Sequence, residues 1–354
     1  MKDTKKLFEL NKEIDAILVT SQKNRYYFTG FSSTAGFLLL TKTGTTFITD
    51  FRYGEMAAPL KKEGVEVVVC GGAETMEYIR NRLHSAGVRK LGFEDTEMTC
   101  AEFEGYRKAI PEVEFAGVGK DIEFIRRYKS PDELKNIAEA QAVTDKVFTH
   151  MLDVIRPGVT EIELAIELEC SIRRFGGEGL AFDTIIASGL NGSKPHAHPT
   201  EKKIEAGDAV TMDFGARYAG YCSDMTRTVF VGKPGDKMKD IYDTVLNAQR
   251  LTLESIKPGM KGCDMDAIAR NYIKSRGYGE YFQHSTGHSV GLDIHESPNL
   301  SPLCETIFEP TMLGTVEPGV YVEGVGGVRI EDLVIFTQDG IKDLTTSPKD
   351  IIIL

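Results

Sequence analysis

The second part of this chain contains a short internal repeat, which leaves few folds open to it. Ile155-Arg156-Pro157-Gly158 recurs as Ile256-Lys257-Pro258-Gly259, and another glycine follows 18 residues after the end of each copy. A helical pattern of similar length precedes each copy, over residues 131–155 and about 237–256. We therefore expect two related α+β halves of about 100 residues, packed into one domain with a pseudo-two-fold relation. A site between such halves should draw equivalent residues from both.

A strong helix start separates this region from the first part of the chain. Ser130-Pro131-Asp132-Glu133 offers an N-cap, a proline suited to the first helical position and a glutamate that can close a capping box. The roughly 120 residues before it alternate strand and helix patterns, which is typical of an α/β layer. The sequence thus predicts an α/β domain over residues 1–124 and an α+β domain over residues 125–354, with a linker near residues 120–129.

Within the first domain, runs of β-branched and apolar residues mark the expected strands. They cover residues 14–20, 36–41, 45–49, 65–69 and 91–94, and the second and third should form a hairpin. Helical patterns occupy residues 54–62, 74–86 and 99–109.

The charge and cysteine content exclude several partners. The 354 residues include 42 basic and 53 acidic side chains, and the net charge is −11. Such a surface repels nucleic acid and anionic lipid, and no apolar run approaches the ~18 residues of a membrane span. The six cysteines lie at least 30 residues apart, which fits cytoplasmic thiols better than a disulfide framework. We expect no nucleic acid or membrane partner and a cytoplasmic location.

Two strand-like runs of the first half carry carboxylates. Asp213 lies in residues 209–215 and Asp224 in residues 221–230. A tight hairpin centred at Tyr218-Ala219 would make the two aspartates direct cross-strand neighbours. Like charges in this arrangement destabilise a sheet, and an unpaired carboxylate among apolar neighbours is costly, so a cation is expected between them. The alternative is that one aspartate points to solvent at a bulge.

The second half repeats this theme. Glu317 stands at a strand end, and residues 328–336 form an apolar strand on which Arg329 and Glu331 share one face, because side chains alternate. One interpretation is a buried structural ion pair between them. The other is a site in which Arg329 orients a carboxylate that binds metal.

Histidines complete the candidate set. Five of the seven histidines fall between residues 196 and 295, and His284, His288 and His295 share one glycine-punctuated stretch. Two aspartates, two glutamates and one histidine exceed the needs of one tetrahedral zinc. Carboxylates can bridge metals, so two divalent ions roughly 3.5–4 Å apart fit better. Oxygen-rich ligation with one imidazole suits Mn²⁺, Co²⁺, Fe²⁺ or Zn²⁺.

One motif points to a different chemistry. Gly287-His288-Ser289-Val290-Gly291 matches the G-x-S-x-G nucleophile elbow, which requires a strand before it, a helix after it and a later acid and histidine. Ser297-Pro298 does not open a long helix, and His295 follows too closely for the usual triad. A serine hydrolase is therefore not expected.

Taken together, these residues resemble a known family. Residues 125–354 closely resemble the pita-bread metallopeptidases, a group that includes methionine aminopeptidase, aminopeptidase P, prolidase and creatinase. The stretches that carry the resemblance are Met212-Asp213-Phe214-Gly215, Ser223-Asp224-Met225-Thr226-Arg227, Thr286-Gly287-His288, Val316-Glu317-Pro318-Gly319 and Arg329-Ile330-Glu331-Asp332. Residues 1–124, with Arg25-Tyr26-Tyr27-Phe28-Thr29-Gly30-Phe31, are similar to the creatinase-like N-terminal domain of the aminopeptidase P and prolidase branch. The implied fold is this α/β domain followed by an α+β pita-bread catalytic domain.

The resemblance also implies roles for individual residues. The implied ligands of two metal ions, with Mn²⁺ expected and Co²⁺, Fe²⁺ or Zn²⁺ as alternatives, are Asp213, Asp224, His288, Glu317 and Glu331. The implied catalytic residues are His196, His284, His295, Arg329 and Glu317. Two positions depart from the family pattern: Ser289 stands where glycine is usual, and His198 follows His196 by two residues.

The implied activity is hydrolysis of the bond before proline, at the N-terminus of peptides or in dipeptides. The implied enzyme is a dinuclear Xaa-Pro peptidase of the aminopeptidase P or prolidase type, acting as a homodimer on peptides with proline at the second position. The sequence does not separate dipeptides from longer substrates. A creatinase-type amidinohydrolase is one alternative, although creatinase needs no metal and all five ligands are present. A catalytically inactive pita-bread binding module is another, although inactive relatives lose ligands.

Overall fold

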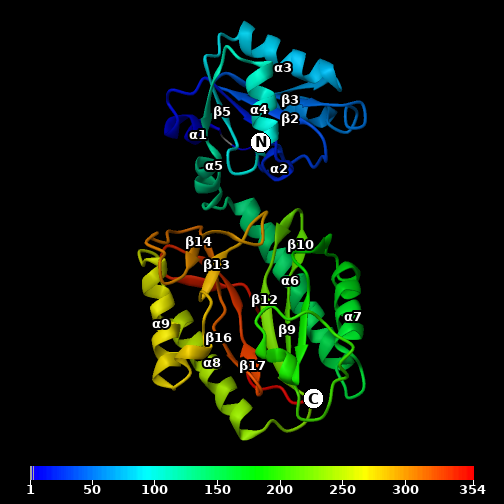
Figure 1. The fold of residues 1–354 in the computed structure, drawn as a ribbon, viewed down its shortest axis with the longest axis vertical. Coiled ribbons are helices and arrows are strands. Elements are labelled where there is room, and N and C mark those ends of the chain that lie inside the picture. Colours follow the sequence, from blue (N-terminus) through cyan, green and yellow to red (C-terminus); the bar gives the residue numbers. More distant parts are fainter. Residues whose placement is uncertain (1, 3) are drawn as a thin grey trace. The chain divides into compact units, whose positions relative to one another are not determined.

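The computed structural model describes residue 2 and residues 4–354. The described chain divides into two compact units, Met1–Arg126 and Arg127–Leu354. Figure 1 labels many of the helices and strands of each unit.

The first unit is built on a mixed sheet with strand order β4-β3-β2-β1-β5-β6. Its strands are β1 Ala16–Val19, β2 Phe37–Thr41, β3 Gly44–Thr49, β4 Val65–Val69, β5 Lys90–Phe93 and β6 Glu114–Gly117. Its helices are α1 Lys5–Leu10, α2 Gln22–Thr29, η1 Ala58–Glu63, α3 Ala73–Ser85, α4 Cys100–Ala109 and α5 Gly119–Arg126. The predicted strands and the β2–β3 hairpin are confirmed. The linker expected near residues 120–129 is instead largely occupied by α5.

One face of this sheet packs on α3 and α4. Leu18, Leu39 and Leu91 from the strands contact Ile79 and Leu83 of α3 in one buried apolar cluster. Burying such side chains is the main favourable term in folding, so alternate strand residues and one stripe of each helix define the layer.

The second unit places helices outside its strands. Figure 1 shows α6 Pro131–Val154 and α7 Glu161–Arg174 on one side, α8 Asp236–Ser255 and α9 Gly262–Ser275 on the other, and strands between them. The predicted helices over residues 131–155 and 237–256 are confirmed by α6 and α8. At the start of α6, the backbone N–H of Ser130 donates to Glu133 Oε2 at 2.8 Å, as the capping-box pattern predicts.

Both helix pairs are followed by short strands. Those after α7 are β7 Gly179–Leu180, β8 Ile185–Ser188, β9 Ala209–Phe214, β10 Ala216–Tyr218, β11 Tyr221–Cys222 and β12 Met225–Phe230, with the 3₁₀ turn η2 Gly189–Ser193 after β8. Those after α9 are β13 Gly287–Ser289, β14 Glu296–Leu300, β15 Leu313–Val316, β16 Gly319–Val322, β17 Gly326–Arg329, β18 Asp332–Phe336 and β19 Ile341–Asp343, preceded by η3 Gly279–Tyr281.

The hairpin of the first half has a different register from the predicted one. Strand β9 pairs with β12 so that Asp213 lies opposite Thr226, while Asp224 falls between β11 and β12. The turn is centred at Ala219-Gly220, where both residues have positive φ, 44° and 75°. A two-residue turn of this kind matches the twist of the strands. The prediction that Asp213 and Asp224 are direct cross-strand neighbours is therefore wrong.

The expected single strand over residues 328–336 is also divided. Strand β17 pairs with β16, whereas β18 pairs with β15, so the chain passes from one sheet to another between them. Glu331 lies at this crossing, and its backbone N–H donates to the carbonyl of Thr226 at 3.1 Å. The crossing fixes Glu331 beside the other half of the domain.

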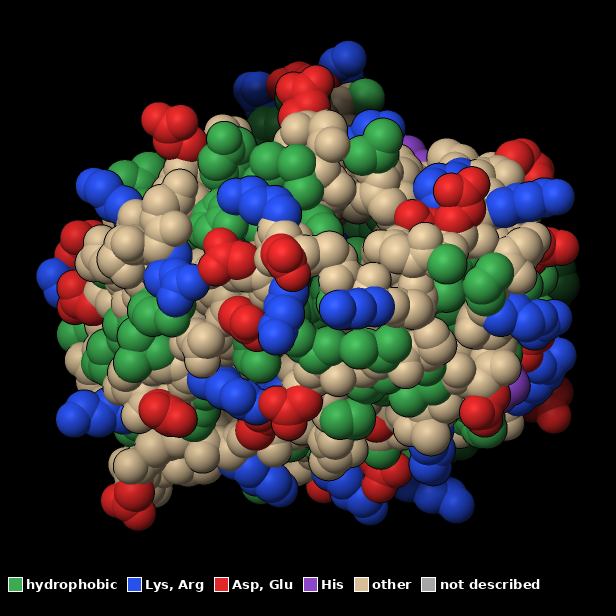
Figure 2. All heavy atoms as spheres, turned by 90° about the horizontal axis from the view of Figure 1, so that it is seen from below, with side chains coloured by type: hydrophobic (Ala, Val, Ile, Leu, Met, Phe, Trp, Pro, Cys, Tyr) green, Lys and Arg blue, Asp and Glu red, His purple; other side chains and the backbone are tan. Residues whose placement is uncertain are grey.

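The surface mixes charges of both signs. On the face drawn in Figure 2, basic and acidic side chains are interspersed with apolar ones. None of the described helices combines the length and apolar character needed to cross a membrane.

Candidate metal centre

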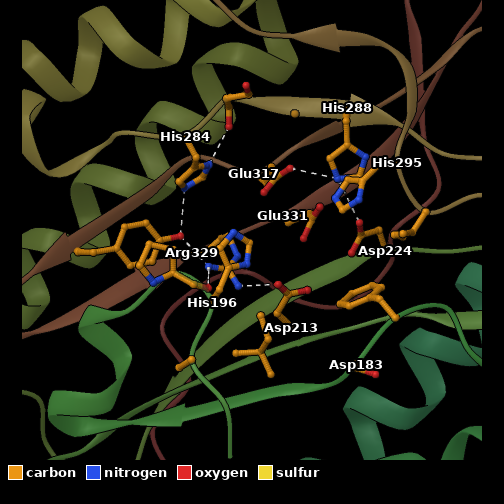
Figure 3. Close-up of a pocket in the computed structure, with 18 of the residues that line it drawn as sticks. Asp183, His196, Asp213, Asp224, His284, His288, His295, Glu317, Arg329 and Glu331 are labelled. Carbon is orange, nitrogen blue, oxygen red and sulfur yellow. Dashed lines mark hydrogen bonds and ion pairs between the residues drawn. The ribbon is translucent and has the colours of Figure 1, made fainter.

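All the site residues expected from the sequence line one cavity of the second unit. The cavity measures about 460 Å³. Figure 3 shows the side chains from both halves converging on it. The expected residues among its lining are His196, Asp213, Asp224, His284, His288, His295, Glu317, Arg329 and Glu331. The structure thus brings together carboxylates and histidines that lie far apart in the sequence.

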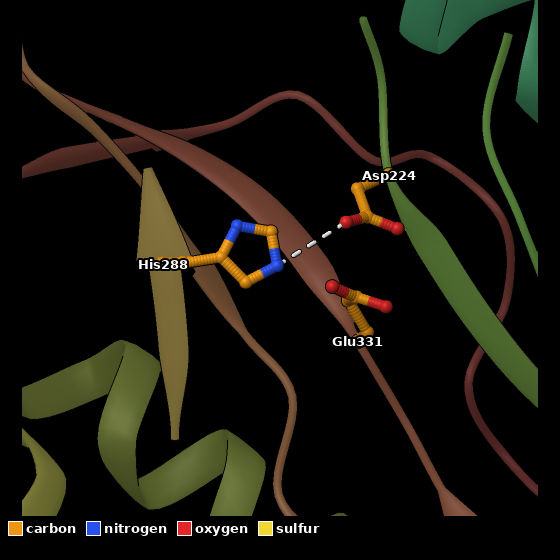
Figure 4. A group of neighbouring side chains, drawn as sticks. All are labelled: Asp224, His288 and Glu331. Carbon is orange, nitrogen blue, oxygen red and sulfur yellow. Dashed lines mark ion pairs between the residues drawn. The ribbon is translucent and has the colours of Figure 1, made fainter. Parts of the chain in front are cut away.

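Three of these side chains form a compact group of potential ligands. One side-chain atom from each of Asp224, His288 and Glu331 lies within 4.8 Å of the other two (Figure 4). His288 Nε2 is 3.5 Å from Asp224 Oδ2 and 3.4 Å from Glu317 Oε1. A cation placed among them would meet one imidazole nitrogen and several carboxylate oxygens.

The backbone fixes the orientation and tautomer of His288. Its Nδ1–H donates to its neighbour's carbonyl, Ser289 O, at 3.1 Å, which leaves the Nε2 lone pair for a ligand. Burial and the nearby His295 lower the pKa of His288 to about 4, so the ring is neutral at pH 7. Gly287 is required for this approach, because a Cβ there would lie 1.9 Å from Thr315 O.

Arg329 holds the opposite side of the group. Its Nη2 donates to Asp213 Oδ2 at 2.5 Å, and its Nε donates to Thr226 Oγ1 at 3.0 Å. The Thr226 hydroxyl in turn donates to Glu331 Oε2 at 2.7 Å. The ion pair found for Arg329 is thus with Asp213 and not the Arg–Glu pair considered from the sequence. Arg329 orients one carboxylate directly and another through Thr226.

The negative charges in the cavity outnumber the positive ones. Asp213, Asp224, Glu317 and Glu331 converge there, whereas Arg329 is the one lysine or arginine among the described residues that line it. The oxygens Asp213 Oδ1 and Glu331 Oε1 are buried and accept no hydrogen bond from the described residues. Unpaired buried oxygens of this kind are costly. The donor set, hard oxygens with one imidazole, fits divalent metal ions.

The pKa values reflect the same imbalance. Burial, and then the charges of Glu331 and Asp213, raise the pKa of Asp224. Burial, and then the charges of Glu317 and Asp213, raise the pKa of Glu331. Burial, together with Asp213, raises the pKa of Glu317 to about 8. In the metal-free chain these carboxyl groups therefore hold protons at pH values where free carboxyl groups have lost them.

This imbalance predicts how the stability of the metal-free chain depends on pH. Folded Glu317, with a pKa of about 8 against an ordinary 4.5, binds more protons than its unfolded form, so its stabilising contribution is lost as pH rises through 8. The lowered pKa of His288 acts in the opposite direction only between about 4 and 6.5. We expect the melting temperature in chelator to fall between pH 7 and 9, and the fall to shrink in Glu317→Gln or with saturating Mn²⁺. A melting temperature that rises over this window would contradict the charge account.

The other histidines occupy the rim and one wall. Burial, and then the charge of Arg329, lower the pKa of His284 to about 4. Its Nε2 lies 3.1 Å from Tyr321 Oη. The His295 ring packs against His288 with centroids 4.4 Å apart. His196 and His198 are both exposed on the loop after η2, and both line the cavity.

Tyr321 and Thr226 are site residues that sequence reasoning missed. Arg329 Nη1 donates to Tyr321 Oη at 2.6 Å, and burial raises the pKa of this tyrosine to about 12. A signal was present, since Tyr321 follows Glu317 by four residues on the next strand and Thr226 follows Asp224 by two. Their contacts depend on pairings between strands, which the spacing alone did not supply.

Comparison with known proteins places the chain in a family. The sequence matches metallopeptidase family M24 over residues 135–338, more than half of the chain. The chain belongs to metallopeptidase family M24. Residues 6–128 of this M24 chain match the creatinase/prolidase N-terminal domain.

Individual relatives match this M24 chain over nearly its whole length. A Xaa-Pro dipeptidase from Pyrococcus horikoshii is 40% identical over 352 residues, which are 98% of this chain and 98% of that protein. The solved structure of a Xaa-Pro dipeptidase from Bacillus anthracis matches with a TM-score of 0.96 and 45% identity, over 99% of this chain and 98% of that one. An X-Pro aminopeptidase from Thermotoga maritima matches with a TM-score of 0.92 and 34% identity, over 97% and 98%. These matches confirm the predicted fold class, an α/β domain followed by a pita-bread α+β domain.

The nucleophile-elbow motif has a different setting in this M24 chain. Ser289 ends strand β13, and the chain continues through a loop to strand β14, where an elbow would require a helix. The Ser289 hydroxyl is buried and lies 3.5 Å from Lys129 Nζ, a weak contact. Ser289→Ala should therefore keep most of the hydrolytic activity, whereas His288→Ala should lose both metal and activity. A serine-directed fluorophosphonate that labels Ser289 and stops turnover would reverse this assignment.

Proposed function

We propose that this chain is a dinuclear-metal Xaa-Pro peptidase that hydrolyses the bond before proline, at the N-terminus of peptides or in dipeptides. The observation that carries the proposal is the convergence of Asp224, His288 and Glu331 within 4.8 Å, beside Asp213 and Glu317 in the same cavity. The activities named for the matching proteins, Xaa-Pro dipeptidase and X-Pro aminopeptidase, support the substrate class. The proposed metal ligands are Asp213, Asp224, His288, Glu317 and Glu331.

Two divalent ions, with Mn²⁺ proposed as the native metal, would supply Lewis-acid polarisation of the scissile carbonyl and a hydroxide at neutral pH. Asp213 and Glu331 each keep one buried oxygen without a partner among the described residues, and these oxygens are available to such ions. Arg329 and Thr226 fix the other oxygens of the same carboxylates, so the ligands are held in place before any ion binds.

Glu317 is the proposed proton carrier. It lies 3.4 Å from His288 Nε2, and its Oε1 accepts a hydrogen bond from Thr315 Oγ1 at 3.2 Å, which fixes the carboxylate in the cavity. A carboxyl group in this position can take the proton of the attacking water and pass it to the departing proline nitrogen. Proline nitrogen leaves poorly without this proton.

His295 and His196 are proposed to stabilise the negative charge that develops on the carbonyl oxygen. Both line the cavity and are exposed, so a bound peptide can reach them. Donors aimed at a developing oxyanion act more strongly once the bound substrate excludes water from them. His284 and Arg329 form the wall behind Tyr321 and hold its hydroxyl.

Hydrolysis assays on a small peptide series test this proposal. Metal-depleted protein supplied with Mn²⁺ should cleave Gly-Pro and Gly-Pro-Pro and leave Gly-Ala and Gly-Ala-Pro intact. Parallel assays with Co²⁺, Fe²⁺ and Zn²⁺ would rank the metals, and the ratio of the two proline peptides would give the length preference. Cleavage of the alanine peptides at the same rate would refute the proline specificity.

The alternatives considered from the sequence have less support. A creatinase-type amidinohydrolase would not need the five converging ligands, and an inactive binding module would not keep them. Release of urea from creatine by the metal-free protein would support the first alternative. Tight peptide binding without cleavage in the presence of every metal would support the second.

We also propose that the enzyme is a cytoplasmic homodimer. All six cysteines are free, with the Cys222 side chain buried, as expected for a protein kept in a reducing compartment. The dimer is proposed because the N-terminal unit matches a creatinase/prolidase domain, a module whose expected role includes subunit contact. Sedimentation of the purified protein at several concentrations tests this state.

A further inference from the structure

We propose that Lys129 and Glu296 form a buried clamp that positions His288 and His295, and that both are positioning residues of the site. This inference rests on the proposed function, since it assigns His288 to metal and His295 to the substrate. Neither Lys129 nor Glu296 lines the cavity among the described residues.

The clamp is a buried ion pair. Lys129 Nζ lies 3.0 Å from Glu296 Oε2, and the two side chains are only 1% and 8% exposed. Lys129 lies just before α6, and its backbone N–H donates to Thr311 O at 3.2 Å. Burying two charges carries a desolvation cost, which close and well-oriented contacts must offset. A pair this deep is therefore not a solubilising surface pair, and we ask which part of the site it holds.

The carboxylate of Glu296 lies inside the loop that joins β13 to β14. Its second oxygen accepts the backbone N–H of Asp293 at 3.2 Å. A Cβ at Gly291 would lie 2.4 Å from Glu296 Oε1, so only glycine leaves room for the carboxylate there. The Gly291 N–H donates to Asp293 O at 2.9 Å, and Gly291 O accepts the N–H of Cys222 at 2.8 Å. The loop is therefore shaped around the Glu296 side chain.

Both ends of this loop carry site histidines. His288 precedes Ser289, the strand partner of Glu296, and His295 directly precedes Glu296. The carbonyl of Ser289 accepts the Nδ1–H of His288 and so selects its tautomer. The two imidazole rings lie side by side, with centroids 4.4 Å apart (Figure 3). A loop that loosens would free His295 and weaken the hold on His288.

The test compares three variants of the clamp with one control. Lys129→Met removes the cation, Glu296→Gln removes the anion, and the double variant leaves a neutral pair that avoids an unpaired buried charge. Lys202→Met is the control, because Lys202 also forms a close ion pair, 2.6 Å from Asp208, outside the cavity lining. All are checked for folding by circular dichroism and melting.

Three readouts separate positioning from mere stability. In metal-free protein, amide hydrogen exchange over residues 289–296 should speed up at least about tenfold in the clamp variants and not in the control. The dissociation constant for Mn²⁺, measured by calorimetry without peptide, should rise about 10–100-fold, as for other groups that orient metal ligands. The kcat is measured at saturating Mn²⁺, which removes the effect of weaker metal binding, on whichever of Gly-Pro and Gly-Pro-Pro the wild type cleaves faster. It should fall at least about tenfold, and this loss should shrink to less than about twofold in a His295→Ala background, because coupled residues are not additive.

These experiments test the clamp separately from the proposed function. Unchanged loop exchange and unchanged Mn²⁺ affinity in the folded double variant would overturn the clamp, as would a kcat loss that persists in His295→Ala. Failure of the single and the double variants to fold would also overturn it, since the pair would then serve folding. If wild-type protein cleaved no proline peptide, the proposed function would be wrong. The rates of amide exchange and the Mn²⁺ affinity would still test the clamp.

Discussion

Asp224→Asn is expected to reduce hydrolysis of proline peptides by more than about 10³-fold, while the chain still folds. This loss is larger than the one that follows removal of a single oxyanion donor. Asp224 is 4% exposed and stands among the ligand atoms around His288 and Glu331. Asparagine keeps its size but loses the charge that holds a cation. Because the change removes one of several neighbouring carboxylates, the metal-free variant should melt no lower than metal-free wild type. Metal analysis, peptide assays and melting in chelator check these expectations.

Asp224 is a better probe than Asp213, whose carboxylate pairs with the buried Arg329 at 2.5 Å. Loss of Asp213 would leave that guanidinium without its partner, and stability would fall for a second reason. Asp236→Asn, at the start of α8 and outside the cavity lining, serves as the control and should keep full activity. An Asp224→Asn protein with normal metal content and normal turnover would refute the ligand assignment.

His295→Ala is expected to lower kcat by about 10²–10³-fold while the metal content stays at the wild-type level. His295 lines the cavity beside His288, but it is His288 that faces Asp224 and Glu317 through Nε2. A residue that stabilises developing charge without holding metal should affect turnover and not metal binding. Steady-state kinetics with metal analysis on the same samples makes the distinction.

His196→Ala should produce a loss of the same order, and His198→Ala a smaller one. His196 directly follows Pro195, whose carbonyl accepts a hydrogen bond from Arg329 Nη1 at 3.3 Å, whereas His198 is two residues further on. The two variants control for each other because both residues are exposed on one loop. If His295→Ala lost a metal ion, or if only His198→Ala were damaging, the roles of these histidines would have to be exchanged.

Features set by local chemistry were predictable from the sequence. Strand β4 matches the predicted run 65–69 at both ends, and α6 begins at Pro131 because the capping residues before it define the start. The carboxylates of the cavity were identified because charged side chains inside apolar runs are rare without a partner, and His284, His288 and His295 because they share one glycine-punctuated stretch. Their types, positions and spacing suggested a metal site before any geometry was known. His196 was identified only through the family resemblance.

Features set by pairing between distant strands were not predictable. The register of the β9–β12 hairpin depended on a turn at Ala219-Gly220, and a positive φ at alanine has no clear sequence signal. The break between β17 and β18 arises because the chain changes partner strands at Glu331. Tyr321 and Lys129 escaped notice for the same reason, since each acquires its role only through contacts across the fold.

Titration of Mn²⁺ into metal-free protein tests the central claim most directly, with hydrolysis followed at each addition on whichever of Gly-Pro and Gly-Pro-Pro the wild type cleaves faster. The five proposed ligands predict no cleavage without metal and activity that reaches its maximum at two ions per chain. Cleavage by the metal-free protein, or full activity already at one ion per chain, would contradict a dinuclear Xaa-Pro peptidase.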